Sequence, residues 1–536
     1  MRSTSFSYAM GGAATGLLTE ERVQANGPAD QDLRKIYGYD DFGNKTLVQT
    51  CAAHSTMRCN TSPNFRSTDE YDVVRYSRVT YDSRGRFPIK TSEPFWDGKQ
   101  SVERDTQFVL SRNVLGAVES AIDVNGVSAY AASGAFGRGT YAWAQTTPSA
   151  MPGNGGAETR TSLRWCGQVA CPTGARFRQR VVTTGAPTQW TWHDVLGRPI
   201  MSASQTFNAG VADKDVSATC TEYDATGKTR RASNPFFLSG TSGSDLSDLS
   251  AAVCQSAPHW TTTEVDVLGR PTRVIGADNT QATSRYDGLT TVTTDPRTNP
   301  TTQKRNGLGE VVQTTDALGL TLFNRYDAAG RLLTVSRDAG QGSIVNTFGY
   351  DALGRKVYQK DPDSGESWYG YNALGELRAQ EDALHNRIET RTDPRGRVWR
   401  KTVRKADGQV ESESTFTFDQ SGNGLGQPSF ETVSGTYAPW AGQIETALSF
   451  SRSYLYDAMG RPQSATTLID GMPYVAATEY DTLGRPYRVQ DASGRWSKTE
   501  FGPRGATAAV CDSDSNDRYW ACGAALLRTL ETDAFG

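Results

Sequence analysis

The sequence predicts an all-β protein, built as a long antiparallel meander of short strands joined by tight turns. Three observations lead to this prediction. An aromatic residue, Asp, two variable residues and Gly recur as a motif along the chain, and Arg often follows the Gly. A turn signal falls about every ten or eleven residues, which leaves room for a strand of about 20 Å. Apolar residues at helical spacing are nearly absent.

Residues 1–35 are expected to form a strand, a Gly-rich turn and a second strand. The segment has one early Arg but lacks the apolar stretch that a signal peptide requires. No run of about 18 apolar residues occurs in the chain, so no membrane-spanning helix is predicted. Both ends interrupt the repeating pattern, and we expect the chain to continue into a longer polypeptide.

Residues 36–260 are predicted to hold degenerate repeats with loop insertions. The motif glycines Gly197, Gly227 and Gly269 lie 30 and 42 residues apart. The additional residues between them are rich in Ser, Gly and Asp, as in residues 239–250. Such a composition is typical of surface loops inserted between strands.

Residues 261–536 are predicted to form a regular array of repeats. The motif glycines Gly309, Gly330, Gly354, Gly375 and Gly396 are 21, 24, 21 and 21 residues apart. A second turn signal lies near the middle of each interval, so each repeat supplies two strands. The residues between the turns are rich in β-branched, aromatic and long side chains, which favour strands.

Each motif position has a predicted structural role. Gly is expected to adopt a backbone conformation that a Cβ disfavours, and Asp is expected to accept backbone N–H groups in the turn. Tyr is expected to stack on the Tyr of the next repeat, and Arg to pair with an Asp of a neighbouring turn. The predicted structural residues are Tyr39, Asp40, Gly43, Tyr81, Asp82, Gly85, Tyr326, Asp327, Gly330, Tyr350, Asp351, Gly354, Tyr456, Asp457, Gly460, Tyr480, Asp481 and Gly484.

The motif resembles the YD repeats of the Rhs family, which includes Rhs polymorphic toxins, the cocoon-forming subunits of Tc toxins and the YD shells of teneurins. The resemblance rests on copies such as YDAAGR at 326–331, YDALGR at 350–355 and YDTLGR at 480–485, and it covers about residues 36–536. It implies a β-sheet strip that spirals into a hollow shell, here a partial cocoon, and a secreted or cell-surface location. In many bacterial members the shell encloses a C-terminal toxin. No self-cleavage residue is carried over, because no C-terminal core segment is recognisable.

Eight cysteines fall into four neighbouring pairs, each around a polar loop. We predict that they form disulfide bonds in an oxidising compartment. Free thiols in a cytosolic precursor and a zinc site are the alternatives, and the absence of any C-x-x-C pair disfavours zinc. The predicted pairs are Cys51 with Cys59, Cys166 with Cys171, Cys220 with Cys254, and Cys511 with Cys522.

The sequence provides no candidate catalytic, cofactor-binding or metal-binding residues, and we predict a protein that is not an enzyme. The H-E-x-x-H and G-x-S-x-G patterns are absent, and most Asp residues occupy the turn position of the motif. His193 replaces a motif Tyr and is expected to stack. Residues 512–517 resemble the start of a calcium loop but lack its later Gly and Glu. Trp399, Trp440 and Trp496 are expected to pack against the sheet, with sugar binding as the alternative.

The predicted function is that of a non-catalytic shell segment that encapsulates and delivers a C-terminal toxin or other cargo in intercellular competition or virulence. The expected partner is the remainder of the same polypeptide. The net charge of −3 gives no basic surface for a nucleic-acid partner. The alternative is a carbohydrate-binding or adhesion module in which the loops at 142–180 and 232–260 recognise glycans or a target-cell surface. Open strand edges are also expected to favour association of the isolated chain.

Overall fold

The protein is described by a computed structural model that covers residues 3–12, 14–24, 27–28, 30–52, 74–96, 101–207, 214–238, 245–337, 344–437, 446–513 and 526–529. These residues form 40 strands and no helix. All the strands belong to one continuous sheet. The predicted all-β class and the antiparallel meander are therefore confirmed.

The first part of the sheet contains the strands up to residue 237. They are β1 (Thr4–Tyr8), β2 (Leu18–Val23), β3 (Leu33–Tyr39), β4 (Lys45–Ala52), β5 (Val74–Tyr81), β6 (Pro88–Trp96), β7 (Ser101–Arg112), β8 (Val118–Asp123), β9 (Ser128–Ser133), β10 (Gly139–Ala144), β11 (Ala157–Trp165), β12 (Phe177–Thr183), β13 (Gln189–His193), β14 (Pro199–Gln205), β15 (Val216–Tyr223), β16 (Thr229–Ser233) and β17 (Phe236–Phe237). Each strand from β1 to β15 pairs antiparallel with the next, as β3 does with β4. The short strand β17 pairs with β15, while β16 pairs directly with β18.

The second part of the sheet contains the shorter and more regular strands from residue 260 onward. They are β18 (Trp260–Val265), β19 (Pro271–Ile275), β20 (Gln281–Asp287), β21 (Thr290–Thr294), β22 (Pro300–Arg305), β23 (Val311–Thr315), β24 (Thr321–Tyr326), β25 (Leu332–Arg337), β26 (Ile344–Tyr350), β27 (Lys356–Asp361), β28 (Gly365–Tyr371), β29 (Leu377–Glu381), β30 (Arg387–Thr392), β31 (Val398–Arg404), β32 (Val410–Phe418), β33 (Pro428–Tyr437), β34 (Thr446–Tyr456), β35 (Pro462–Ile469), β36 (Met472–Tyr480), β37 (Pro486–Gln490), β38 (Trp496–Phe501), β39 (Thr507–Ser513) and β40 (Leu526–Thr529). The short apolar segment at residues 524–530 is described only at residues 526–529, which form β40.

A local irregularity marks the position of the motif aromatic residue in the ladder. The register shifts between Gly349 and Tyr350 in β26, and between Leu455 and Tyr456 in β34. A bulge of this kind bends the strand and increases its twist. Because the bulge recurs with the motif, the bending accumulates in one direction along the strip.

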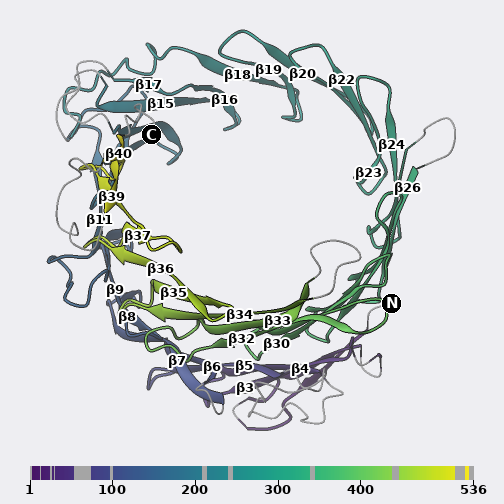
Figure 1. Ribbon diagram of the computed structural model, residues 1–536. Helices are drawn as coiled ribbons and strands as arrows, with labels where there is room; N and C mark the ends of the chain where they lie inside the picture. Colours follow the sequence, from purple (N-terminus) through teal and green to yellow (C-terminus); the bar gives the residue numbers. More distant parts are fainter. Residues whose placement is uncertain are drawn as a thin grey trace.

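The strip curves into a ring around an open centre and continues past its own beginning (Figure 1). Strands β3 to β9 lie at the bottom of that view, β15 to β20 at the top and β22 to β26 on the right. Strands β30 to β36 then return along the bottom beside the first strands. The chain therefore forms one complete revolution and part of a second.

The largest hydrophobic core lies on one part of the strip rather than through its length. Trp190 and Trp192 of β13 are fully buried there with Met201 of β14 and Ala218 of β15. Leu246 from the following insertion completes this core. Elsewhere the strand residues are mostly half-buried, as expected for a strip that exposes both faces.

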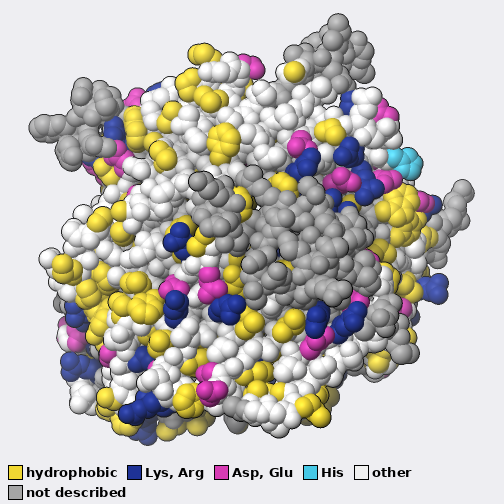
Figure 2. All heavy atoms as spheres, turned by 90° about the horizontal axis from the view of Figure 1, so that it is seen from below, with side chains coloured by type: hydrophobic (Ala, Val, Ile, Leu, Met, Phe, Trp, Pro, Cys, Tyr) yellow, Lys and Arg dark blue, Asp and Glu magenta, His cyan; other side chains and the backbone are white. Residues whose placement is uncertain are grey.

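The face of the molecule seen from below carries both signs of charge. Figure 2 shows Lys and Arg side chains interspersed with Asp and Glu, and hydrophobic side chains scattered between them. This mixture agrees with a net charge of −3. In the part of the chain that the structure describes, no helix is long and apolar enough to cross a membrane.

Candidate functional site

The repeated motif builds a compact corner between two strands, which we define as the five residues from the motif Asp to the following Arg or its equivalent. In the corner from Asp351 to Arg355, the carboxylate Oδ1 of Asp351 accepts the backbone N–H groups of Leu353 and Arg355, both at 2.9 Å. Gly354 has a φ of 83°, and its N–H donates to the backbone carbonyl of Asp351. This geometry is that of a hairpin turn with a glycine bulge.

The same turn chemistry recurs at all the predicted Asp and Gly positions. Each of the six Asp side chains accepts at least one backbone N–H group within its own corner. Each of the six glycines has a positive φ, between 64° and 83°. The Asp residues are Asp40, Asp82, Asp327, Asp351, Asp457 and Asp481, and the glycines are Gly43, Gly85, Gly330, Gly354, Gly460 and Gly484. Their roles are those that the motif predicts for a turn.

The described motif tyrosines do not stack on one another, and this prediction was wrong. Tyr350 donates its hydroxyl to the backbone carbonyl of Leu332 at 2.9 Å. The guanidinium of Arg331, from the preceding corner, lies 5.3 Å from the centroid of the Tyr350 ring. Successive motif tyrosines are separated by two strand spacings, about 9–10 Å, which exceeds the distance of an aromatic pair. Arginine bridges that distance.

This tyrosine arrangement is general along the strip. Five of the six motif tyrosines donate their hydroxyl to a backbone carbonyl. For four of them the carbonyl lies just after the preceding corner, and for Tyr39 it is that of Leu18 in β2. The other four are Tyr326, Tyr350, Tyr456 and Tyr480. Tyr81 is half-buried at the end of β5. Burial raises the pKa of Tyr456 to about 12, so its hydroxyl stays protonated as a donor.

The motif arginines pair mainly with the Asp of their own corner, which corrects the expected pairing with a neighbouring turn. Arg331 Nε donates to Asp327 Oδ2 at 2.6 Å, and Arg461 Nε donates to Asp457 Oδ2 at 2.8 Å. Arg331 also donates to the backbone carbonyl of Asp351 in the next corner at 3.0 Å. Arg397 is an exception, because it binds both its own Asp393 and the next corner's Asp419.

The cysteines form disulfide bonds in the described part of the chain. Cys166 is bonded to Cys171 and Cys220 to Cys254, the pairs that the spacing predicts. Cys51 and Cys511 are also disulfide-bonded. Their predicted partners, Cys59 and Cys522, lie outside the described residues.

Three further expectations concern a histidine, three tryptophans and the segment at residues 512–517. The His193 ring stacks on Phe177, with centroids 4.7 Å apart and an interplanar angle of 11°. Trp399 and Trp496 are half-buried, whereas Trp440 and most of the run at 512–517 lie outside the described residues. Among the residues that the structure describes, no group of three His, Cys, Asp or Glu side chains could hold a metal ion.

The corners of the second revolution contact the first revolution along a line that we call the seam. Arg355 pairs with Asp30 at 3.1 Å, and Arg395 pairs with Glu93 at 3.2 Å. Thr146 donates to the carbonyl of Thr482 at 2.6 Å. The hydrogen-bonded partners across the seam are 298 to 336 residues apart in the sequence. One revolution of the strip therefore contains this number of residues.

The seam joins opposite edges of the strip. The second revolution contributes its corners, including Arg504, whose guanidinium lies 2.6 Å from Asp215. The first revolution contributes the turns on the other edge, such as the one at Asn125, which exchanges two hydrogen bonds with Leu425. We call these two edges the corner edge and the opposite edge. The seam could not be predicted from the sequence, because its partners lie about 300 residues apart and follow no local pattern.

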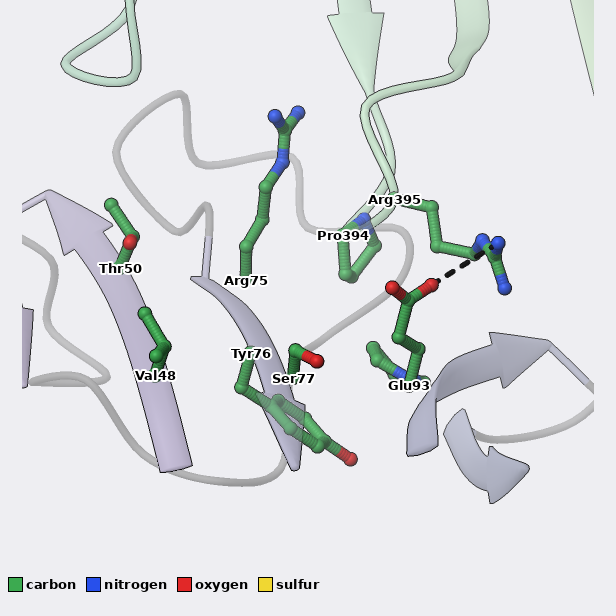
Figure 3. Close-up of a pocket in the computed structure, with 9 residues that line it drawn as sticks. Val48, Thr50, Arg75, Tyr76, Ser77, Glu93, Pro394 and Arg395 are labelled. Carbon is green, nitrogen blue, oxygen red and sulfur yellow. Dashed lines mark ion pairs between the residues drawn. The ribbon is translucent and has the colours of Figure 1, made fainter. Parts of the chain in front are cut away.

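A cavity of about 290 Å³ lies on the seam (Figure 3). Arg75 and Tyr76 of β5 line it together with Glu93 of β6 and Arg395 of a corner. The ion pair between Glu93 and Arg395 crosses one side of the cavity. Burial lowers the pKa of Arg395, an effect that Glu93 opposes. The charges that face this cavity are already paired, since Arg75 also contacts Glu376.

A β-strip that curves through repeated corners until its second revolution contacts its first is the fold of a class of proteins, the repeat shells. Comparisons with known proteins place this chain in that class by its fold. The crystal structure of TcdB2-TccC3 covers 96% of this chain with a TM-score of 0.54 and 13% sequence identity. A Photorhabdus luminescens Tc holotoxin pore covers 100% of the chain with the same TM-score and identity. The predicted resemblance to Rhs/YD shells is confirmed at the level of the fold.

The chain corresponds to only part of each protein that it resembles. It spans 35% of the matched chain of TcdB2-TccC3 and 38% of that of the holotoxin pore. A curated relative, double-stranded DNA deaminase toxin A of Burkholderia cenocepacia (strain H111), is 34% identical over 93 residues, which are 6% of that protein. No family model matches the sequence. The comparisons thus support the shell fold of this chain.

Proposed function

We propose that this chain is a wall segment of a secreted container that encloses a toxin or another part of the same polypeptide. The observation that carries this proposal is the seam. A strip whose second revolution binds the first through ion pairs and hydrogen bonds forms a wall in which the two revolutions are held edge to edge. An open strip would not separate an interior from the solvent.

The corner chemistry supports a container rather than a catalyst. The recurring corner geometry uses Asp, Gly, Arg and Tyr for turn formation and for contact with the next corner, as at Arg331. These contacts repeat along the strip, so the stability of the wall grows with the number of strands. The likeness of the fold to that of the Photorhabdus luminescens Tc holotoxin pore supports a role in carrying a toxin.

The experiment measures protection of the polypeptide outside residues 1–536. The full natural gene is expressed with a specific protease site placed either in the flanking segment or in the exposed turn at Asp363. We expect cleavage at Asp363 and protection of the flanking site until denaturant opens the shell. Equal cleavage rates at both sites in the native protein would contradict encapsulation.

The deaminase relative also calls for a direct test of catalysis. Nucleobase deaminases bind zinc through a signature that includes C-x-x-C, and this sequence has no such pair. We therefore expect no uracil in double-stranded DNA incubated with this chain and zinc. Uracil above the level of a protein-free control would show that the chain is an enzyme. Glycan or cell-surface recognition by the insertions stays a prediction.

A further inference from the structure

Residues 245–257 form a cap over the largest apolar cluster of the wall. The cap consists of turns and contains no strand. Leu246 is 1% exposed and Leu249 is 7% exposed, whereas most of the other cap residues are exposed. The two leucines belong to the same cluster as Trp190 and Trp192 of β13. The cap is therefore a single layer of chain that shields this apolar face of the strip from solvent.

No strand ladder holds the cap on the strip, since none of its residues belongs to a described strand. Its own backbone hydrogen bonds close turns within the cap. Toward the strip, Thr173 donates its backbone N–H and its hydroxyl to the carbonyl of Ala251. Arg178 donates to the backbone carbonyl and the carboxylate of Asp245. These contacts involve single residues, so each can be lost without disturbing the sheet.

Two disulfide bonds, both fully described, lie at this cap. The bond between Cys220 and Cys254 joins the cap directly to β15. Cys220 is 1% exposed, whereas Cys254 is half-buried. The bond between Cys166 and Cys171 closes the loop next to Thr173, the residue that contacts the cap. All four sulfur-bearing residues pack in or against the same apolar cluster. The cap is thus fastened to the strip by sulfur chemistry rather than by backbone pairing.

We propose that the bond between Cys220 and Cys254 is a redox-sensitive latch, whose reduction frees the cap and uncovers the apolar face of β13 to β15. The reductant is a low-molecular-weight thiol such as glutathione. Its thiolate attacks the half-buried sulfur of Cys254, the sulfur–sulfur bond breaks, and Cys220 leaves as a thiolate that takes up a proton. A second thiolate then attacks the reductant's sulfur in this mixed disulfide, which releases Cys254 and forms the oxidised reductant. Two electrons and two protons thus pass to the protein.

Breaking this bond favours the open cap, because the cross-link restricts the open state more than the closed state. Cys220 and Cys254 are 34 residues apart, and a bond across such a loop removes much of its conformational entropy. After reduction the closed cap keeps its leucine contacts, whereas the open cap is tethered only at β17 and β18. The open population therefore rises roughly a hundredfold. The latch stays closed in an oxidising compartment and opens in a reducing one.

The test uses the full natural protein that contains this chain, with hydrogen exchange read by mass spectrometry. The protein is measured oxidised, after treatment with reduced glutathione, and after reoxidation. We expect exchange within residues 245–257 to become roughly a hundredfold faster on reduction and to return on reoxidation. Exchange in β33, far from the cap in the sequence, is expected to stay unchanged. Alkylation of free thiols shows in the same samples whether Cys220 and Cys254 are reduced.

Variants of the same protein separate this latch from the other disulfide bonds. The double variant Cys220→Ser and Cys254→Ser is expected to exchange fast in the cap without glutathione. The matched control, Cys166→Ser and Cys171→Ser, keeps the latch and is expected to need glutathione. If the first variant fails to fold, Leu246→Ala leaves both bonds intact and is expected to open further than the unaltered protein on reduction.

Three results would overturn the proposal. The first is a bond between Cys220 and Cys254 that glutathione leaves intact in the folded protein. The second is a cap that stays protected with both thiols free, and the third is an equal loss of protection throughout the sheet. These readouts come from the cap itself, so they do not depend on whether the shell encloses cargo.

Discussion

The Arg355 side chain shows how a single residue joins two corners and two revolutions. Its Nε donates to Asp351 in the same corner, and another nitrogen donates to the backbone carbonyl of Asn372 in the next corner. The guanidinium also lies 4.9 Å from the ring centroid of Tyr371 and pairs with Asp30 across the seam. Only a planar group with several donors can make these contacts together.

Replacing Arg355 by Lys tests the need for that planar group. The substitution keeps the positive charge but removes the fork of donors, so we expect Arg355→Lys to destabilise the chain by about 1–3 kcal/mol. The control Arg325→Lys changes an exposed side chain in β24 and is expected to have an effect below about 0.5 kcal/mol. Urea unfolding measures both, and equal effects would mean that charge alone is sufficient.

The corner carboxylates predict loss of stability in acid. The backbone N–H of Arg331 lowers the pKa of Asp327, and the backbone N–H of Arg270 lowers that of Asp266. Because the folded-state pKa lies below the unfolded value of about 3.9, the stabilisation is present above that pH and is lost as the pH falls through the folded-state pKa. Urea midpoints are therefore expected to fall below about pH 4. The double variant Asp266→Asn and Asp327→Asn is expected to show a shallower fall, and an unchanged pH dependence would exclude these two groups as its source.

At this scale, the sequence predicts the backbone roles well and the side-chain partners poorly. The roles of Gly354 and Asp351 follow from local rules, because positive φ and turn hydrogen bonds involve residues within one corner. The partner of Tyr350 depends on the separation between corners, which is set by two strand spacings. That distance excludes ring stacking and favours the intervening Arg331.

At the scale of strands and loops, the insertion after β17 behaves differently from the expected surface loop. Leu246 and Leu249 are buried against Trp190 and Trp192, and Arg178 donates to the carbonyl of Asp245 at 2.6 Å. Two leucines among Ser and Asp gave no clear apolar pattern in the sequence. The loop packs because Cys254 ties it to β15 and brings those leucines over the sheet.

The two described disulfide bonds are expected to contribute unequally to stability. Cys220 and Cys254 are 34 residues apart, whereas Cys166 and Cys171 are 5 apart. Chain entropy in the unfolded state predicts a loss of about 4 kcal/mol for the Cys220→Ser and Cys254→Ser double variant, and about 2 kcal/mol for the matching Cys166 and Cys171 variant. Denaturant unfolding of the two double variants gives the comparison. A larger loss from the shorter loop would show that packing, rather than loop length, decides the effect.

The regular strands could be predicted because every hairpin repeats one local solution. A turn signal every ten or eleven residues leaves little choice of strand length, and β22 to β31 are 5 to 7 residues long. Antiparallel pairing of consecutive strands then follows from the short connections. No information from distant parts of the chain is needed for this part of the fold.

At the scale of the whole molecule, the number of residues in one revolution is the quantity that the sequence leaves undetermined. It depends on the sum of many small bends at the bulges and of the twist between strands. Small changes in each bend would alter which residues meet after 298 to 336 positions. The seam selects one outcome, because its ion pairs and close glycine contacts fit only one alignment of the two edges.

Two glycines with the same backbone geometry separate the role of the seam from that of the turn. Gly505 has a φ of 87° and Gly309 has a φ of 85°. A Cβ at Gly505 would overlap the backbone carbonyl oxygen of Gly185 across the seam, whereas a Cβ at Gly309 meets nothing within 4 Å. Gly309→Ala therefore carries only the cost of a left-handed residue, about 1–2 kcal/mol.

Gly505→Ala is expected to carry the same backbone cost and, in addition, to separate the two revolutions at this point. The predicted signature is faster hydrogen exchange at Thr206, whose carbonyl accepts a hydrogen bond from Arg504, and around Thr146, which donates to Thr482. Gly309→Ala should leave exchange at both places unchanged, since its corner lies outside the seam. If the two variants gave the same exchange pattern, the overlap of the revolutions would not depend on edge contact, and the closed wall inferred from the seam would lose its physical basis.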